Sequence, residues 1–343
     1  MAGKHKTIPI FVPHWGCPQD CLFCNQKAIT GQKEEMTPER AEAIIRAGTR
    51  EKEPGDIIEI GFFGGSFTGI PAPQQEALLQ PAYQAVLDGR ADGIRLSTRP
   101  DYINEAVLLR LKRFGVTTVE LGAQSMNDAV LFGCHRGHTA DKTVAAAKMI
   151  QAAGFELGLQ MMLGLPGDSF ETACMTAEAF ISLHPRSVRI YPTLVLCGTK
   201  LKELYETGGY IPLSLQEAVE QCAVLYEMFQ SENIDVIRMG LLDMEPESIC
   251  AGPYHPAFGE LVMSQVCYNR LAKQVAPFYG QAVTIQSNPR CVSILVGQKR
   301  SNIDRLTREF SLKKITIEQD SNMDWGVFSV LQNNDTDCGI RKV

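Results

Sequence analysis

The chain has 343 residues, of which 45% are hydrophobic and 21% are charged, and its formal net charge at pH 7 is −6. This length and composition are typical of a globular protein with one large domain and one smaller domain. The negative net charge argues against a globally basic nucleic-acid binder, and no DNA partner is expected. A local basic patch is still compatible with this net charge.

The N-terminal segment "MAGKHKTIPIFVPHWG" is interrupted by Pro9 and Pro13 and lacks a small-residue cleavage site, so a β-strand is expected here rather than a signal peptide. No run approaches the roughly 18 to 20 apolar residues of a membrane-spanning helix. We therefore expect a cytoplasmic protein with no membrane partner. In a reducing cytosol its eleven cysteines should not form a disulfide framework. Those scattered singly are expected to be buried small hydrophobic residues: Cys134, Cys174, Cys197, Cys222, Cys250, Cys267, Cys291 and Cys338.

Apolar, β-branched runs predict six strands, at residues 7–13, 56–63, 93–98, 117–123, 156–163 and 187–195. Segments with helical periodicity separate them, beginning with 37–52 and ending with 214–232. Strands that alternate with helices indicate a parallel sheet covered by helices. The predicted fold class is therefore α/β, a partial (β/α)6 barrel over residues 1–235.

From residue 236 the pattern becomes irregular, and residues 236–343 are expected to form a small α+β domain. A helix is predicted near 258–275 and another over 301–310, where Ser301 and Asp304 resemble a capping box. The segments "VTIQ", "VSILVG" and "KKITIEQ" are predicted strands, and the tail "NNDTDCGIRKV" is expected to fray.

Three cysteines lie close together in "CPQDCLFCNQ", at Cys17, Cys21 and Cys24. Structural zinc would require a fourth ligand, for which His14 is the nearby candidate. Three thiolates on an iron-sulfur cluster would instead leave one iron open to another ligand. The loop also follows the first predicted strand, at the end of a β/α barrel where active sites lie.

This C-x3-C-x2-C motif, with Phe23 before its last cysteine, resembles the hallmark of the radical S-adenosylmethionine superfamily. The resemblance implies a partial barrel of the radical SAM type, with Cys17, Cys21 and Cys24 as the catalytic ligands of a 4Fe-4S cluster. It also implies S-adenosyl-L-methionine on the open iron and an external electron donor. Reductive cleavage of this cofactor would yield a 5′-deoxyadenosyl radical, which takes hydrogen from an unactivated carbon.

The resemblance also places cofactor contacts on later motifs. Glycines in "GFFGGSFTG" allow the backbone to approach the cofactor closely, and Arg136 in "CHRGHT" would bind its carboxylate. Ser97 and Gln160 stand where relatives resembling coproporphyrinogen dehydrogenase use ribose-binding carboxylates, so Arg99 or Asp101 could contribute there. The implied cofactor residues are Phe23, Gly64, Gly65, Ser66, Ser97, Arg99, Gln124, Arg136, Gln160, Arg189 and Tyr191.

The segments "GGSFTG", "VELGAQS", "RGHT" and "MMLGLPGD" are similar to the radical domain of the Elongator catalytic subunit, a tRNA uridine-modifying enzyme. This likeness covers residues 7–235. The Elongator family spaces its first two cluster cysteines more widely, and residues 236–343 are too few for its acetyltransferase domain. The acetyl-coenzyme A route to modified uridine is therefore not expected here.

The predicted C-terminal domain contains a basic face. Residues 281–315 carry seven Lys or Arg against two acidic residues. The segment "VGQKRSNI" is similar to the G-x-x-G loop of KH RNA-binding modules, with Arg300 in place of the second glycine. Lys299, Arg300 and Arg305 are therefore candidate RNA contacts through charge at a helix N-terminus. A solvated helix face is the structural alternative.

The sequence favours an enzyme that modifies a nucleotide of RNA, either tRNA or rRNA, by radical chemistry. One alternative is the same chemistry on a small molecule such as a tetrapyrrole. Another is a non-enzymatic iron-sulfur redox sensor.

Overall fold

The computed structural model describes residues 4–12, 17, 21–25, 35–241 and 243–333. The chain forms two compact units, Met1–Ala218 with Met228–Pro256, and Val219–Glu227 with Ala257–Val343. His14, the alternative zinc ligand, lies outside the described residues, as does nearly all of the tail that was expected to fray. Among the described residues, no helix combines the length and the apolar character needed to cross a bilayer.

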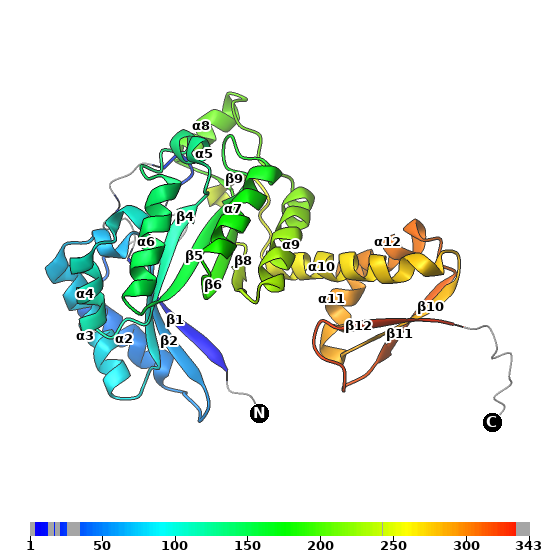
Figure 1. The fold of residues 1–343 in the computed structure, drawn as a ribbon, viewed down its shortest axis with the longest axis horizontal. Helices are drawn as coiled ribbons and strands as arrows, with labels where there is room; N and C mark the ends of the chain where they lie inside the picture. The colour runs from blue at the N-terminus through cyan, green and yellow to red at the C-terminus, as the bar shows by residue number, and fades with distance from the viewer. Residues whose placement is uncertain (1–3, 13–16, 18–20, 26–34, 242, 334–343) are drawn as a thin grey trace. The chain divides into compact units, whose positions relative to one another are not determined.

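The first unit is built on a curled sheet of seven strands, all parallel and arranged in chain order (Figure 1). The predicted α/β partial-barrel fold is confirmed. The strands are β1 (His5–Phe11), β2 (Ile57–Phe63), β3 (Gly93–Thr98), β4 (Thr118–Gln124), β5 (Glu156–Leu163), β6 (Ser187–Pro192) and β8 (Asp235–Met239).

Strand β8 was not predicted, because its sequence "DVIRM" lacks an apolar run. It is an edge strand whose residues are exposed or half-buried, so packing does not demand apolar side chains along it. The prediction of six strands was therefore one strand short.

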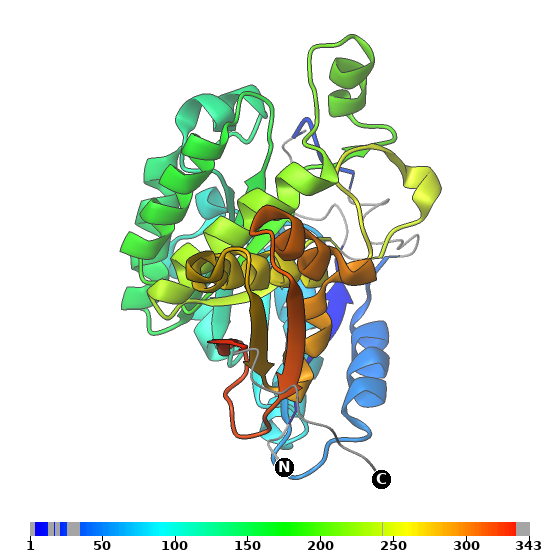
Figure 2. The same cartoon turned by 90° about the vertical axis from the view of Figure 1, so that its right-hand side faces the viewer.

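Helices cover the outer face of this sheet, and α2 lies beside β1 (Figure 2). Thr37 begins α2 by accepting a hydrogen bond from the backbone N–H of Arg40. The helices are α2 (Pro38–Thr49), α3 (Ala72–Leu87), α4 (Glu105–Arg113), α5 (Asp128–Gly133), α6 (Ala140–Ala152), α7 (Phe170–Ser182), α8 (Lys200–Glu206) and α9 (Leu215–Ser231). A small antiparallel pair, β7 (Val195–Leu196) and β9 (Ile249–Ala251), completes the unit.

Alternation along the strands separates an apolar outer face from a polar inner face. In β4, Val119 and Leu121 are fully buried, whereas Gly122 and Gln124 line an internal cavity. Successive side chains of a strand point to opposite faces, so each strand contributes to both the core and the cavity wall. The core therefore fixes the positions of the residues that face inward.

The second unit combines helices with a three-stranded sheet in the order β11-β10-β12, so the α+β prediction is confirmed. Strand β10 is parallel to β11 and antiparallel to β12. The elements are α10 (Phe258–Val275), β10 (Ala282–Ser287), α11 (Val292–Val296), α12 (Ser301–Glu309), β11 (Lys314–Gln319) and β12 (Phe328–Gln332). Their core includes Leu271, Val283, Ile285, Leu295 and Leu306.

Two local predictions in the second unit were wrong. The segment "VSILVG" forms helix α11 rather than a strand, because a short apolar run has no periodicity of its own and packing of Leu295 into the core decides its state. The capping box at Ser301 does not form. Arg300 occupies the N-cap position in a left-handed conformation and makes no side-chain cap.

The scattered cysteines are not uniformly buried, contrary to expectation. Cys134, Cys222, Cys267 and Cys291 are buried, whereas Cys174, Cys197 and Cys250 are partly exposed. Cys338 lies outside the described residues.

Candidate active site

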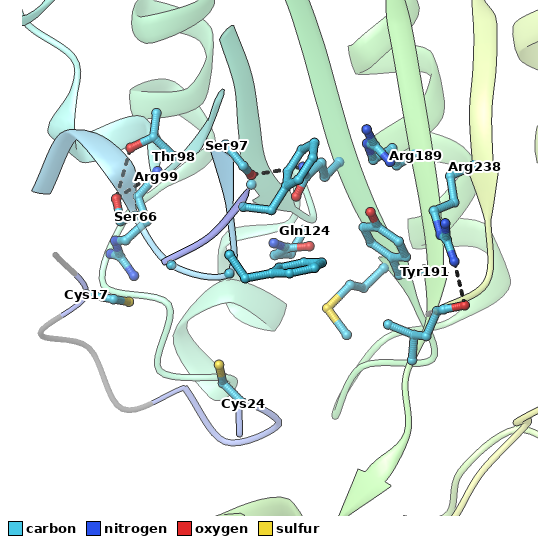
Figure 3. Close-up of a pocket in the computed structure, with 18 of the residues that line it drawn as sticks. Cys17, Cys24, Ser66, Ser97, Thr98, Arg99, Gln124, Arg189, Tyr191 and Arg238 are labelled. Carbon is cyan, nitrogen blue, oxygen red and sulfur yellow. Dashed lines mark hydrogen bonds between the residues drawn. The ribbon is translucent and has the colours of Figure 1, made fainter. Parts of the chain in front are cut away.

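The first unit encloses a cavity of about 560 Å³ on the inner face of the sheet (Figure 3). Every residue that the sequence assigned to the cluster or to the cofactor lines it. These residues are Cys17, Cys21, Phe23, Cys24, Gly64, Gly65, Ser66, Ser97, Arg99, Gln124, Arg136, Gln160, Arg189 and Tyr191.

Backbone hydrogen bonds position the described part of the cysteine loop. Leu22 donates its N–H to the carbonyl of Cys134 at 3.2 Å and accepts from Leu201 at 2.8 Å. The Leu22 and Phe23 side chains are buried. The segment that carries Cys21 and Cys24 is thus attached to the chain at two points distant in sequence.

The turn after β2 brings the backbone of Gly64 to the cavity. Gly64 has a φ of +93°, a conformation that favours glycine. Ser66, next in the cavity wall, exchanges a hydrogen bond of 2.9 Å with Thr98 and accepts one from the backbone N–H of Arg99. The Ser66 hydroxyl therefore joins the ends of β2 and β3.

Two buried arginines lie beside the cysteine loop. Arg136 donates from Nη1 to the sulfur of Cys21 at 3.3 Å and from Nη2 to the carbonyl of Gly122. Arg99 is fixed by both carboxylate oxygens of Asp101 and donates to the backbone carbonyl of Arg136. Asp101, which the sequence suggested as a cofactor contact, thus orients Arg99.

Unsatisfied polar atoms point to a ligand at this end of the cavity. Arg99 Nη1, Gln124 Oε1 and Arg136 Nε are buried and have no hydrogen-bond partner among the described residues. Gln124 also adopts a φ of +71°, which is uncommon for a residue other than glycine. Such groups are costly unless a bound molecule pairs with them.

His138 is a buried residue near this site that the sequence analysis did not single out. Burial, followed by the charges of Arg136 and Arg99, lowers the pKa of His138 to about 4. Its imidazole is therefore neutral at pH 7, and it adds no further positive charge beside the two guanidinium groups.

A second polar network on the inner face was not predicted as a network, and its central residues Glu120 and Arg95 were missed. The carboxylate of Glu120, only 1% exposed, accepts two hydrogen bonds from Arg189, at 2.7 and 3.0 Å, and one from Arg95 at 2.9 Å. Burial alone would raise its pKa, but the guanidinium groups of Arg189 and Arg95 hold it below the usual range. A charged residue between the apolar neighbours of "TVELGA" was the signal in the sequence.

Gln160 belongs to this network. Its amide donates to Glu120 at 2.8 Å and to the hydroxyl of Ser97 at 3.0 Å. Ser97 and Gln160, the two positions at which the resemblance implies carboxylates, are therefore joined by a hydrogen bond. Glu120, on the strand between them, supplies a carboxylate.

The opposite wall of the cavity carries Arg189, Tyr191 and Arg238, as Figure 3 shows. Arg238 on β8 is held by the carbonyl of Leu241 at 2.8 Å. This residue was also missed, because the strand that carries it was not predicted. The cysteines and these cationic side chains thus lie on opposite sides of one cavity.

The residues present fit a 4Fe-4S cluster with S-adenosylmethionine. Three cysteines line the same cavity, and this donor set is the one that an open iron site requires, although their sulfurs are not gathered into a metal-binding group among the described residues. Beside them, the unpartnered Nη1 of Arg99 and Nε of Arg136 can donate to a carboxylate, and the free oxygen of Gln124 can accept from a hydroxyl or an amine.

Replacing Glu120 tests the inner network. Glu120→Gln should lower the free energy of unfolding near neutral pH by about 3 kcal/mol, since it leaves the buried guanidinium of Arg189 without its carboxylate, whereas Arg95 keeps its ion pair with Glu59 at 2.7 Å. Because the folded-state pKa of Glu120 lies below its unfolded value, the contribution is present above the unfolded pKa and is lost as pH falls through the folded pKa. Urea unfolding at pH 7 and below pH 4 measures both effects.

The isosteric Glu318→Gln, on an exposed residue of the second unit, is the control. An equal stability loss in both variants, or an unchanged acid dependence for Glu120→Gln, would contradict the assignment.

Two family models match the chain. One, described as Radical SAM superfamily, matches residues 12–180, and the other, described as Radical_SAM C-terminal domain, matches residues 185–267. The chain is also 29% identical over 205 residues to the tRNA uridine(34) acetyltransferase of Methanocaldococcus infernus, covering 54% of this chain and 38% of that protein. It thus spans less than half the length of that relative.

A relative of similar extent is an uncharacterized protein of Methanocaldococcus jannaschii, 27% identical over 279 residues, which cover 79% of this chain and 82% of that protein. Among solved structures, the archaeal Elp3 of Methanocaldococcus infernus superposes with a TM-score of 0.61 at 22% identity, over 80% of this chain and 64% of that one. That superposition supports the fold. The cysteine motif and the two family models show that the chain belongs to the radical S-adenosylmethionine superfamily, whose members use a 4Fe-4S cluster and S-adenosylmethionine.

Proposed function

We propose that this protein is a radical S-adenosylmethionine enzyme that modifies a nucleotide of tRNA. The observation that carries the proposal is the presence of three cysteines and several unpartnered buried polar atoms in the wall of one cavity. The likeness to a tRNA uridine(34) acetyltransferase supports tRNA as the substrate class. A cytoplasmic location and an external electron donor belong to the same proposal.

When bound, the cluster and S-adenosylmethionine supply one-electron chemistry that removes a hydrogen atom from an unactivated carbon. Cys17, Cys21 and Cys24 would hold the cluster. Arg136, with its backbone fixed by Arg99, would orient the carboxylate of the cofactor.

The remaining cavity residues would bind the cofactor's ribose and the substrate. Gln124 offers an unpartnered oxygen to a hydroxyl. On the opposite wall, Arg238 offers positive charge near Tyr191, whereas Arg189 is paired with Glu120; Arg238 suits an anionic or hydrogen-bond-accepting group of a nucleotide.

The second unit would hold the RNA. Lys299 and Arg300 are exposed at the turn between α11 and α12, and both have positive φ angles. Neither side chain belongs to the hydrophobic core of the unit, and the N-terminus of α12 has no side-chain cap. Two exposed cationic side chains beside a helix N-terminus suit a phosphate group.

Arg305 would have a supporting role rather than a direct one. Its guanidinium lies 3.8 Å from the ring centroid of Tyr268 and forms an ion pair with Glu309 at 3.7 Å. These contacts occupy much of the side chain, unlike the exposed Lys299 and Arg300.

Replacing a cluster cysteine tests the chemistry. Cys24→Ala should lose bound iron, visible absorbance and cleavage of S-adenosylmethionine together, because the cluster loses one of its three protein ligands. Anaerobic reconstitution followed by iron analysis and 5′-deoxyadenosine detection measures all three. Cys174→Ala, outside the cavity, is the control and should retain them. Full cluster content in Cys24→Ala, or zinc in the wild type, would contradict the proposal.

Replacing Arg136 tests cofactor binding. Arg136→Ala should weaken the binding of S-adenosylmethionine by roughly 1.5–3 kcal/mol, which is the usual contribution of a hydrogen bond to a charged group. Equilibrium dialysis on the reconstituted protein gives the dissociation constant, and iron content shows whether the cluster remains. An unchanged dissociation constant would remove Arg136 from the cofactor site.

Reversing charge at the turn tests RNA binding. Lys299→Glu with Arg300→Glu should weaken tRNA retention and reduce its salt dependence, since each lost phosphate contact lowers the slope of log K against log salt by about 0.7–0.9. Lys142→Glu with Lys148→Glu, on exposed positions of α6, changes the net charge equally and is the control. Equal effects in both double variants would contradict a specific RNA surface.

Mass spectrometry of tRNA from cells with and without the gene then identifies the modified nucleotide.

A further inference from the structure

Two cysteines outside the cavity lie in contact. The sulfur of Cys197 is 2.7 Å from the sulfur of Cys250, and both residues are partly exposed. They are separated by 53 residues in the chain. Neither lines the cavity, and the cluster chemistry leaves both without a role.

The backbone brings these side chains together through an irregularity in the β7–β9 pair. Val195 pairs with Ala251 and Leu196 with Ile249, which leaves Cys250 as an extra residue in β9. An extra residue of this kind redirects a side chain, and such bulges are frequent beside functional sites. Cys197 follows β7 and donates its N–H to the carbonyl of Ser248 at 2.9 Å. Both cysteine backbones are thus fixed by the same short sheet.

The two thiols influence each other's ionisation. The hydrogen bond with Cys197, followed by burial, raises the pKa of the Cys250 thiol, and the ammonium of Lys202, which is paired with Glu206 at 2.6 Å, acts in the opposite direction. Cys250 is therefore mainly a neutral thiol near pH 7, and exchange would proceed through its minor thiolate form. Partial exposure gives a small molecule access to the pair, whereas Cys134 and Cys222 are buried.

We propose that Cys197 and Cys250 form a thiol–disulfide exchange site for low-molecular-weight disulfides. One thiolate attacks a sulfur of the small disulfide and forms a mixed disulfide, releasing one small thiol. The other cysteine then attacks the mixed disulfide at the protein sulfur, which forms the Cys197–Cys250 bond and releases the second small thiol. Two electrons pass from the protein to the small disulfide, and the two protons leave with the two released thiols.

The bond would join strands next to the candidate active site. Leu194 and Leu196, on either side of Val195, line the cavity. The carbonyl of Cys197 accepts a hydrogen bond of 2.8 Å from Asn25, the residue after Cys24. Oxidation would therefore connect β9 covalently to a segment that forms the cavity wall and contacts the cysteine loop.

Peptide mapping of the full-length, cluster-loaded protein tests the site. The protein is incubated anaerobically with oxidised glutathione, alkylated and digested with trypsin. The expected product links peptide 190–200 to peptide 239–270, and it disappears on treatment with dithiothreitol. Cys174, a partly exposed cysteine elsewhere, is an internal control that can form only a glutathione adduct. It should require about tenfold more oxidised glutathione, since it lacks a neighbouring thiol for an intramolecular second step.

Single replacements identify the sulfurs. In Cys197→Ser, Cys250 should carry a stable glutathione adduct, and in Cys250→Ser the adduct should lie on Cys197. Cys267 shares the second peptide but is buried, and the linked product should persist in Cys267→Ser. Separate adducts on Cys197 and Cys250 in the wild type, with no link between their peptides, would overturn the proposal. A link from either residue to Cys17, Cys21 or Cys24 would overturn it as well. Since the mapping measures a linkage and not activity, these outcomes are independent of the radical chemistry.

Discussion

The carboxylate of Glu120 allows the half-barrel to keep a polar interior. It lies on the central strand of the sheet and accepts hydrogen bonds from Arg189 on β6, Arg95 on β3 and Gln160 on β5. An isolated charge at this depth would be prohibitive, but the two guanidinium groups compensate it and hold the neighbouring strands in register. The polar inner wall of the cavity follows from this arrangement.

On that scaffold, the site divides into two walls with different chemistry. One carries the three thiols with Arg99 and Arg136, and the other carries Arg189, Tyr191 and Arg238. The first suits a cluster and the amino acid portion of its cofactor, and the second suits a polar substrate. A cofactor on the first wall and a substrate on the second would share one cavity, so their reacting atoms could approach to the roughly 3–3.5 Å that transfer between two bound molecules requires.

Local sequence was sufficient to predict those parts of the fold and the site that depend on a single strand or a single motif. The spacing of Cys17, Cys21 and Cys24 and the paired glycines after β2 predicted residues that share one wall of the cavity, because each motif lies on a contiguous segment. Glu120 and Arg95 escaped notice because their importance arises only when neighbouring strands pair. Strand β8 was not predicted because an edge strand need not be apolar. Helix α11 was predicted as a strand because five apolar residues suit a strand or a helix equally until the core around Leu295 is formed.

The order of strands along the chain bears on when the cofactor site can be completed during folding. Adjacent strands β1 to β6 are consecutive in sequence, so the sheet can grow by short crossover steps. The cysteine loop differs, because its anchors are distant: Arg136 lies 115 residues from Cys21, and Cys197 lies 172 residues from Asn25. Closing such long loops is entropically costly until the intervening chain is ordered. Cys21 and Asn25 therefore acquire these contacts only after β7 has been synthesised and docked, and we expect cluster insertion to follow the folding of the half-barrel.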